Sequence, residues 1–195
     1  AEIPLLQQNN RVSLSRQCSI TISAWYHALD LKGCIVTQFE MMGLPAKLVA
    51  RLSEMGITEP TPIQSHAVPY ALQARDVMGL AQTGSGKTAA FGLPLITQML
   101  EFKSKPAPAS TRGLVLAPTR ELAKQIRDTL TQLVQKTPLK VALVVGGASI
   151  NMQAKLMQRG SDLLVATPGR LIDLLDREAL TLSQTSFLVL DEADQ

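Results

Sequence analysis

Aromatic residues and cysteines are scarce in this chain of 195 residues. Phe, Trp and Tyr together make up 4% of it, and Cys18 and Cys34 are its two cysteines. Neither cysteine lies in a CxxC pair or at metal-ligand spacing from a histidine, which argues against a zinc site. We interpret both as free thiols of a cytoplasmic protein, with a disulfide as the alternative. The chain also lacks an apolar run approaching about 18 residues and a secretory signal, so we expect no membrane segment.

Charge is sparse as well. Charged residues make up 18% of the sequence, and 19 basic against 16 acidic residues leave a net charge of +3. This mild excess is compatible with a polyanionic partner without indicating one. Apolar residues make up 46%, enough to build a core, which excludes a disordered tail. At roughly 100–200 residues per domain the length fits one domain, and it excludes two lobes of about 200 residues each within this chain.

The apolar pattern alternates between strands and helices over most of the chain. Helical spacing predicts helices over residues 44–55, 61–74, 86–100, 120–135, 149–158 and 168–175. Short apolar runs predict five strands, at residues 77–81, 113–117, 141–145, 162–166 and 187–190. This alternation is typical of an α/β domain in which helices cover both faces of a parallel sheet. Residues 1–38 show no sustained period, and we interpret them as an extension of uncertain order before a domain at 39–195.

A glycine-rich stretch, residues 81–88 (AQTGSGKT), follows the first predicted strand and opens a helix. In that context glycines let successive backbone N–H groups point at a phosphate, and the helix N-terminus adds its dipole. Lys87 would reach the β- and γ-phosphates, and Thr88 would offer a hydroxyl to Mg²⁺. Ala81 replaces the first glycine of the usual pattern. The stretch predicts a nucleotide site, with a turn that binds nothing as the alternative.

Two carboxylates follow the last predicted strand directly, at Asp191 and Glu192. An acid at the end of a buried strand must offset its desolvation, and a Mg²⁺ ion does so. We expect Asp191 to hold the metal and Glu192 to orient and deprotonate the water that attacks a phosphate anhydride. An ordinary solvated face is the alternative.

Six short segments follow one another along the chain, at residues 56–64 (GITEPTPIQ), 81–88, 117–122 (APTREL), 146–147 (GG), 167–170 (TPGR) and 191–194 (DEAD). In this order they resemble six motifs of DEAD-box RNA helicases, namely the Q motif, phosphate loop, motif Ia, GG element, motif Ib and acidic motif. The chain therefore resembles an incomplete N-terminal RecA-like domain of this family, in the style of its bacterial members. That resemblance implies a P-loop fold, ATP and Mg²⁺ as cofactors, and RNA as partner.

The resemblance assigns roles to particular residues. Lys87, Asp191 and Glu192 would be catalytic, with Thr88 and Asp191 near the metal and Asp194 coupling the two domains of the family. ATP would be bound by Phe39, Thr61, Gln64, Gln82, Thr83, Gly84, Ser85, Gly86, Lys87 and Thr88. The amide of Gln64 can donate and accept at once, as the edge of adenine requires. RNA phosphates would be gripped, without reading bases, by Pro118, Thr119, Arg120, Gly146, Gly147, Thr167, Pro168, Gly169 and Arg170. Phe39 as a core residue and Arg120 as the partner of a nearby acid are the open alternatives.

The family also has parts that this chain lacks. A Ser-Ala-Thr strand and a second RecA-like domain with arginine fingers would follow residue 195. We therefore expect this chain alone to lack helicase activity and to have at most residual ATPase activity. We also expect an unpaired sheet edge or a gap near the phosphate-loop strand. A non-enzymatic remnant that binds RNA or protein is the alternative function.

Overall fold

The computed structural model describes residues 37–82 and 84–193. Nearly all of the predicted N-terminal extension, both cysteines, Thr83 and Asp194 lie outside the described residues. Within the described part of the chain, no helix is long and apolar enough to cross a membrane.

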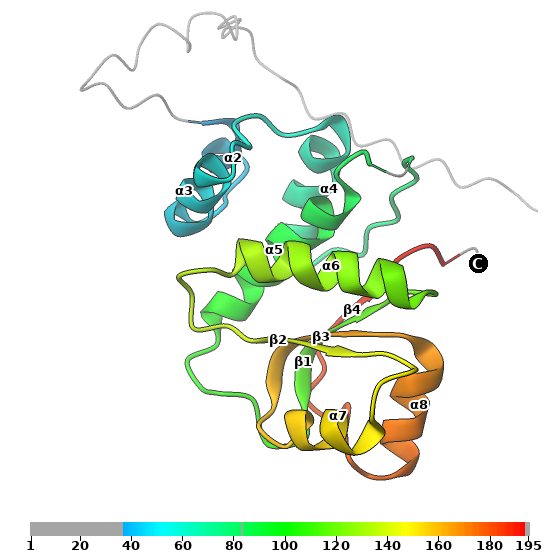
Figure 1. Cartoon of the computed structure of the whole chain (residues 1–195). Helices are drawn as coiled ribbons and strands as arrows, with labels where there is room; N and C mark the ends of the chain where they lie inside the picture. Colours follow the sequence, from blue (N-terminus) through cyan, green and yellow to red (C-terminus); the bar gives the residue numbers. More distant parts are fainter. Residues whose placement is uncertain (1–36, 83, 194–195) are drawn as a thin grey trace, which may run out of the picture. The chain divides into compact units, whose positions relative to one another are not determined.

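Four parallel strands form one sheet in the order β2-β3-β1-β4 (Figure 1). They are β1 (Thr111–Leu116), β2 (Val141–Val144), β3 (Ser161–Ala166) and β4 (Phe187–Leu190). Val115 of β1 pairs in register with Val165 of β3 on one side and with Val189 of β4 on the other. The two central strands are almost entirely buried, which explains why they read as continuous apolar runs in the sequence.

Seven helices accompany the sheet within the described residues. They are α2 (Gln38–Met41), α3 (Ala46–Glu54), α4 (Pro62–Leu72), α5 (Lys87–Glu101), α6 (Arg120–Leu133), α7 (Ile150–Met157) and α8 (Pro168–Asp176). Local signals set several starts. Thr37 forms a capping box with Glu40, Thr119 caps α6, and prolines occupy the first turns of α4 and α8. The predicted helices are confirmed to within a few residues at their ends.

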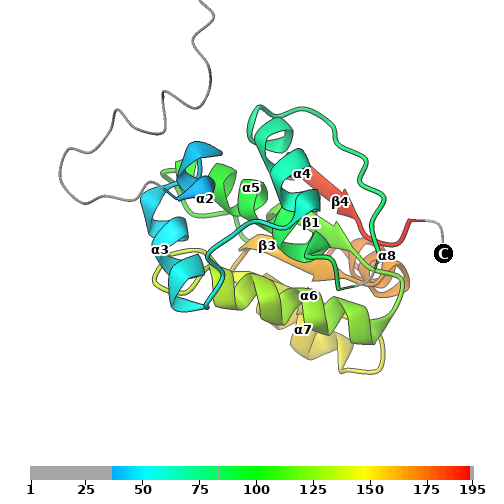
Figure 2. The same cartoon turned by 90° about the horizontal axis from the view of Figure 1, so that it is seen from above.

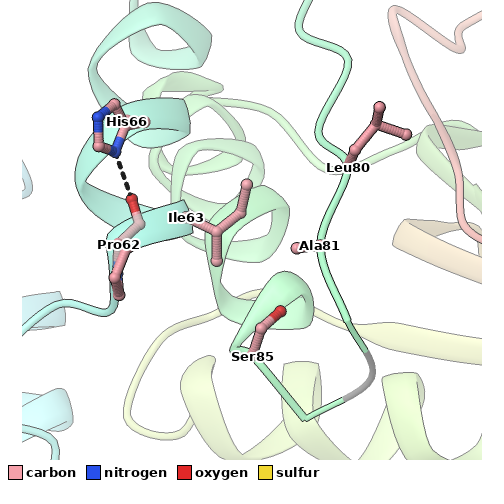
Figure 3. A pocket seen from close by; sticks show the side chains of 6 residues that line it. All are labelled: Pro62, Ile63, His66, Leu80, Ala81 and Ser85. Carbon is pink, nitrogen blue, oxygen red and sulfur yellow. Dashed lines mark hydrogen bonds between the residues drawn. The ribbon is translucent and has the colours of Figure 1, made fainter.

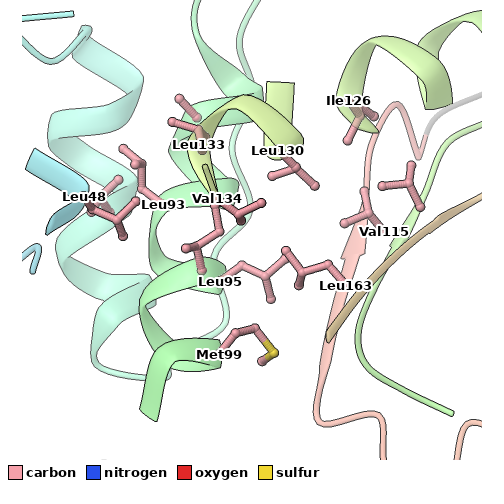
Figure 4. Close-up of a cluster of buried hydrophobic side chains, with 14 of the residues drawn as sticks. Leu48, Leu93, Leu95, Met99, Val115, Ile126, Leu130, Leu133, Val134 and Leu163 are labelled. Carbon is pink, nitrogen blue, oxygen red and sulfur yellow. The ribbon is translucent and has the colours of Figure 1, made fainter. Parts of the chain in front are cut away.

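The two faces of the sheet carry two separate hydrophobic clusters. Val115, Leu163 and Val165 face the larger cluster, which includes side chains of α5 and α6 (Figure 4). Their neighbours Leu114 and Leu164 face the opposite way, into a smaller cluster with side chains of α7 and α8. Figure 1 shows the corresponding layers, with α6 above and α7 below the strands, and in Figure 2 the same layers are seen from above, with α6 in front of α7. Alternate strand residues thus bury both faces, and the predicted fold class is confirmed.

A buried ion pair joins the N-terminal ends of the two central strands. The Arg112 guanidinium on β1 lies 3.2 Å from the Asp162 carboxylate on β3, and both residues are 6% exposed. Arg112 also donates to the Ser104 carbonyl and lies over the Phe102 ring, while Asp162 accepts the Lys140 backbone N–H. Each charge is therefore paired and hydrogen-bonded at the end of the sheet opposite the loops described below.

The strand predicted at residues 77–81 is wrong. This segment has no ladder partner among the described residues, and Met78 and Leu80 are 89% and 90% exposed. An apolar run becomes a strand only when a neighbouring strand pairs with its backbone N–H and C=O groups, and none of the four strands of the sheet does so here. Among the described residues β4 is an edge strand, and its Leu188 and Leu190 are more than half exposed. The edge or gap expected near the phosphate-loop strand stays a prediction, because that strand does not form.

Candidate functional site

The loops that carry the motifs gather at the carboxyl ends of the strands. Ladder hydrogen bonds continue past these ends, from the Ala117 N–H to the Ala166 carbonyl, from Thr167 to Val144 and from Asp191 to Leu116. The segments that begin at residues 117, 145, 167 and 191 therefore start at the same edge of the sheet. In open parallel sheets this edge is where ligands bind.

The glycine-rich loop leads directly into α5. Gly84 and Gly86 have φ angles of 82° and 90°, in the left-handed region that glycine adopts without strain, and Gly86 is the N-cap of α5. Lys87 and Thr88 follow in the first turn and are half-buried, while Gln82 and Gly84 are exposed. The first N–H groups of this long helix have no intrahelical acceptor and are available to an anion. The two glycines and the free helix N-terminus are compatible with phosphate binding, and the strand predicted before the loop is absent.

Gln64 ties α4 to this loop. Its side chain is buried, its Nε2 donates to the Gly86 carbonyl over 3.1 Å, and its Oε1 accepts the Thr61 backbone N–H over 3.0 Å. The residues of the predicted Q motif and of the phosphate loop are therefore brought together. Both ends of the Gln64 amide have a protein partner, and one N–H of Nε2 is left for a ligand.

A cleft of about 370 Å³ lies between α4 and the segment that enters the loop. Figure 3 shows Pro62, Ile63 and His66 on the α4 side and Leu80, Ala81 and Ser85 on the other. The His66 Nδ1–H donates to the Pro62 carbonyl over 2.7 Å, so this histidine supports the helix. The cleft is mainly apolar, which suits a flat ring more than a charged group.

One buried hydroxyl that lines the cleft, the Oγ of Ser85, has no hydrogen-bond partner among the described residues, while the Thr61 hydroxyl beside it belongs to the capping box of α4. Buried polar groups are usually paired, and unpaired ones at a phosphate-type loop fit a polar ligand. The residues present therefore fit a nucleotide.

Phe39 lies in a different environment. It is 1% exposed on α2 and belongs to the larger hydrophobic cluster. In this structure it packs as a core residue, the alternative noted above, and its stacking on adenine stays a prediction.

The acidic residues follow β4 at the same edge. Asp191 and Glu192 are half-buried, and Glu192 has a φ of 51°, a conformation that non-glycine residues seldom adopt. Among the described residues, the ion pairs include neither carboxylate and do not include Lys87. No group of three metal-ligating side chains is found there either. A Mg²⁺ ion keeps several water and phosphate ligands, so it needs few protein groups, and its site at Thr88 and Asp191 stays a prediction.

Three of the predicted RNA-contact segments lie against one another. The Arg120 guanidinium, at the start of α6, lies over Gly146 and Gly147, where a Cβ atom on either glycine would collide with it. Arg170, in the first turn of α8, donates from Nη1 to the Ala148 carbonyl over 2.8 Å. The structure thus brings together the loops after β1, β2 and β3. Arg120 has no acidic partner among the described ion pairs, so the alternative that it pairs with a nearby acid finds no support.

The remaining predicted contacts surround this cluster. Thr119 caps α6 by accepting the Leu122 N–H, Thr167 is buried at the end of β3, and Pro168 begins α8. A Cβ on Gly169 would meet no atom within 4 Å, so this position is open. One residue that the sequence reasoning missed is Gln153, a buried glutamine of α7 that holds the turn after β2. A polar residue on the same helix face as buried Met157 was the available signal.

Two glycine variants test the tie between Gln64 and the loop. A Cβ on Gly86 would lie 2.5 Å from the Gln64 Nε2, whereas one on Gly84 would meet no atom within 4 Å, and both residues have positive φ. Gly84→Ala should cost the backbone strain alone, about 1–2 kcal/mol. Gly86→Ala should cost more and should also weaken ATP binding. Thermal unfolding and titration with a fluorescent ATP analogue measure both effects, and equal losses in the two variants would contradict the tie.

Comparisons with known proteins agree with the resemblance seen in the motifs. The DEAD/DEAH box helicase family matches residues 61–195. The chain is 47% identical over 159 residues to the pre-mRNA-splicing ATP-dependent RNA helicase PRP28 of Yarrowia lipolytica, covering 80% of this chain and 28% of that protein. It is 44% identical over 158 residues to the DEAD-box ATP-dependent RNA helicase CshA of Streptococcus pneumoniae, covering 81% of this chain and 29% of that protein.

A solved structure matches as well. The RNA helicase Prp28 of Chaetomium thermophilum, bound to ADP, superposes with a TM-score of 0.71 at 45% identity, covering 80% of this chain and 38% of that one. The predicted RecA-like fold is thereby confirmed. The chain spans less than a third of the length of the curated relatives named above, and because these come from both Yarrowia and Streptococcus, a bacterial type stays a prediction. Since the family match covers more than half of the sequence, the chain belongs to the DEAD/DEAH box helicase family.

Proposed function

We propose that this chain is the ATP- and RNA-binding lobe of an ATP-dependent RNA helicase. One observation carries the proposal. A phosphate-type loop opens α5, and three loops with free N–H groups begin at one edge of a parallel sheet, two of them leading into helices with Arg120 and Arg170 in their first turns. Such an edge binds a nucleotide and a phosphodiester backbone by the same means, namely exposed backbone N–H groups and fixed cations.

In this proposal ATP lies along the loop at residues 82–88. Ser85 offers its unpaired hydroxyl and Thr61 lies beside it, the glycine-rich backbone and Lys87 bind the phosphates, and the free N–H of Gln64 faces the base. Thr88 and Asp191 would hold Mg²⁺, which neutralises charge on the phosphates when bound. Glu192 accepts a proton from the attacking water, and the bond between the β-phosphate oxygen and the γ-phosphorus breaks, leaving ADP and phosphate.

RNA lies across the loops after β1, β2 and β3. Arg120 and the N–H groups near Thr119, Gly147 and Gly169 contact successive phosphates, with Arg170 beside them. Contacts of this kind do not read bases, so we propose that binding tolerates any sequence. We further propose that unwinding needs a second RecA-like domain, which in this family supplies the arginines that complete the hydrolysis site.

Removal of the Arg120 charge tests the RNA part of the proposal. Arg120→Met should weaken binding of a labelled single-stranded oligonucleotide and lower the slope of log K against log salt by about 0.7, the value for one phosphate contact on a single strand. Fluorescence anisotropy over a range of salt concentrations measures both quantities. Arg177→Met, which removes an exposed charge at the far end of α8, is the matched control and should leave the slope unchanged. Equal salt slopes in the two variants would show that Arg120 does not contact an RNA phosphate.

A further inference from the structure

We propose that Gln153 is a positioning residue for RNA binding, because it fixes the turn at residues 145–149, here called the GG turn. This inference rests on the proposed function, since it explains how one of the RNA-contact loops keeps its shape. Gln153 itself is buried in α7 and is not placed against RNA.

The contact that supports this role is buried. The Gln153 Nε2 donates to the Val145 carbonyl over 3.0 Å, and Gln153 is 7% exposed. Val145 is the first residue after β2, where ladder bonding to β3 stops, because the last such bond runs from the Thr167 N–H to the Val144 carbonyl. The glutamine therefore supplies the donor that this buried carbonyl would otherwise lack.

The other end of the GG turn is also fixed. Arg170 donates to the Ala148 carbonyl, and the Arg120 guanidinium covers Gly146 and Gly147 between the two anchored carbonyls. The turn is thus held by α7 at Val145 and by α8 at Ala148. Gly147 has a φ of 80°, so the backbone between the anchors takes a shape that only these constraints and a glycine allow.

The held turn presents unpaired donors. Across the described residues, no backbone N–H from Gly146 to Ser149 donates to a protein acceptor, and residues 147–149 are exposed. Consecutive free N–H groups in such a turn form an anion-binding concavity. Their directions depend on where the carbonyls on either side are held, because each peptide unit is rigid.

The chemistry of Gln153 favours positioning over packing. Its Oε1 is buried with no partner among the described residues, which is unfavourable. An apolar side chain of similar length, such as methionine, would fill the same space without that penalty. The hydrogen bond from Nε2 to the Val145 carbonyl of the GG turn explains why an amide stands at this position.

The test compares Gln153, which lies within α7, with Gln158, the C-cap residue of the same helix. Gln153→Met removes the donor at nearly constant volume, and Gln158→Met makes the same change at the exposed C-cap of this helix. Loss of one hydrogen bond predicts that Gln153→Met binds a single-stranded oligouridylate about fivefold more weakly than wild type. The salt slope and the affinity for ATP should stay unchanged, because no charge and no nucleotide contact is lost. Gln158→Met should match wild type in every measurement.

A spectroscopic readout separates this role from a general loss of stability. The backbone order parameters of Gly146, Gly147 and Ala148 should fall in Gln153→Met, while the amides of the strands keep their protection from hydrogen exchange. RNA affinity within twofold of wild type would overturn the proposal, as would a parallel loss of ATP and RNA binding. If wild type binds no oligouridylate, the proposed function fails. In that case the order parameters still decide whether Gln153 holds the GG turn.

Discussion

Alanine in place of Lys87 is expected to lower the affinity of this chain for ATP by about 100-fold, since a hydrogen bond between charged groups contributes up to about 3 kcal/mol. Lys87 is the first residue of α5, directly after the Gly86 N-cap, where its ammonium adds a full charge to the helix dipole. A triphosphate bound at this terminus would lose its one lysine contact. Titration with a fluorescent ATP analogue measures the change.

The control for Lys87 removes the same charge nearby. Lys103 is exposed and lies just beyond the opposite end of α5. Lys103→Ala should bind the analogue as wild type does, because its charge lies far from the helix N-terminus and is screened by salt. Equal affinities of the Lys87 and Lys103 variants would mean that the glycine-rich loop does not hold the phosphates.

Asp162→Ala is expected to have the largest effect on stability, about 3–5 kcal/mol, because it leaves the Arg112 guanidinium buried without a counter-charge. The Lys140 N–H loses its acceptor as well. Urea unfolding followed by circular dichroism measures the loss. Asp176→Ala, an exposed acid at the end of α8, should change stability by no more than about 0.5 kcal/mol.

A double variant separates the charge from the space it fills. In Arg112→Met combined with Asp162→Leu, neither charge is left alone, so much of the stability lost in Asp162→Ala should return. A double variant as unstable as Asp162→Ala would show that the hydrogen bonds to Ser104 and Lys140, and not the unpaired charge, dominate the effect.

The sequence predicts the parts of the fold that depend on local pattern. Helix starts at Pro62, Arg120 and Pro168 follow from caps and first-turn prolines, and β4 is found at its predicted residues. The strand at 77–81 fails because its apolar pattern is local, whereas its formation depends on a neighbouring strand. Apolar character is a necessary condition for a buried strand and not a sufficient one.

The parts of the candidate site that depend on local motifs were also predictable from the sequence. The motifs place the loops at one edge, and Arg120 beside Gly146 and Gly147 follows from parallel strands ending together. The contacts that hold these loops were not predictable. Gln64 contacts Gly86, which is 22 residues away in the sequence, and Arg112 contacts Asp162, which is 50 residues away. No local sequence pattern predicts contacts at such separations. In the sequence Arg112 and Asp162 look like ordinary surface residues, and the Q motif singles out Gln64 without indicating its contact with Gly86.

The most direct measurement is the map of backbone amide resonances of the isotope-labelled chain during titration, first with ATP and Mg²⁺ and then with a single-stranded RNA. We predict that ATP shifts the amides of Gly84 to Thr88, and that RNA shifts those of Gly146, Gly147 and Gly169. Thr111 and Ser161, at the opposite ends of β1 and β3, should stay unmoved by either ligand. Shifts confined to those opposite strand ends, or none at the glycines with either ligand, would contradict a shared ATP and RNA site at the carboxyl edge of the sheet.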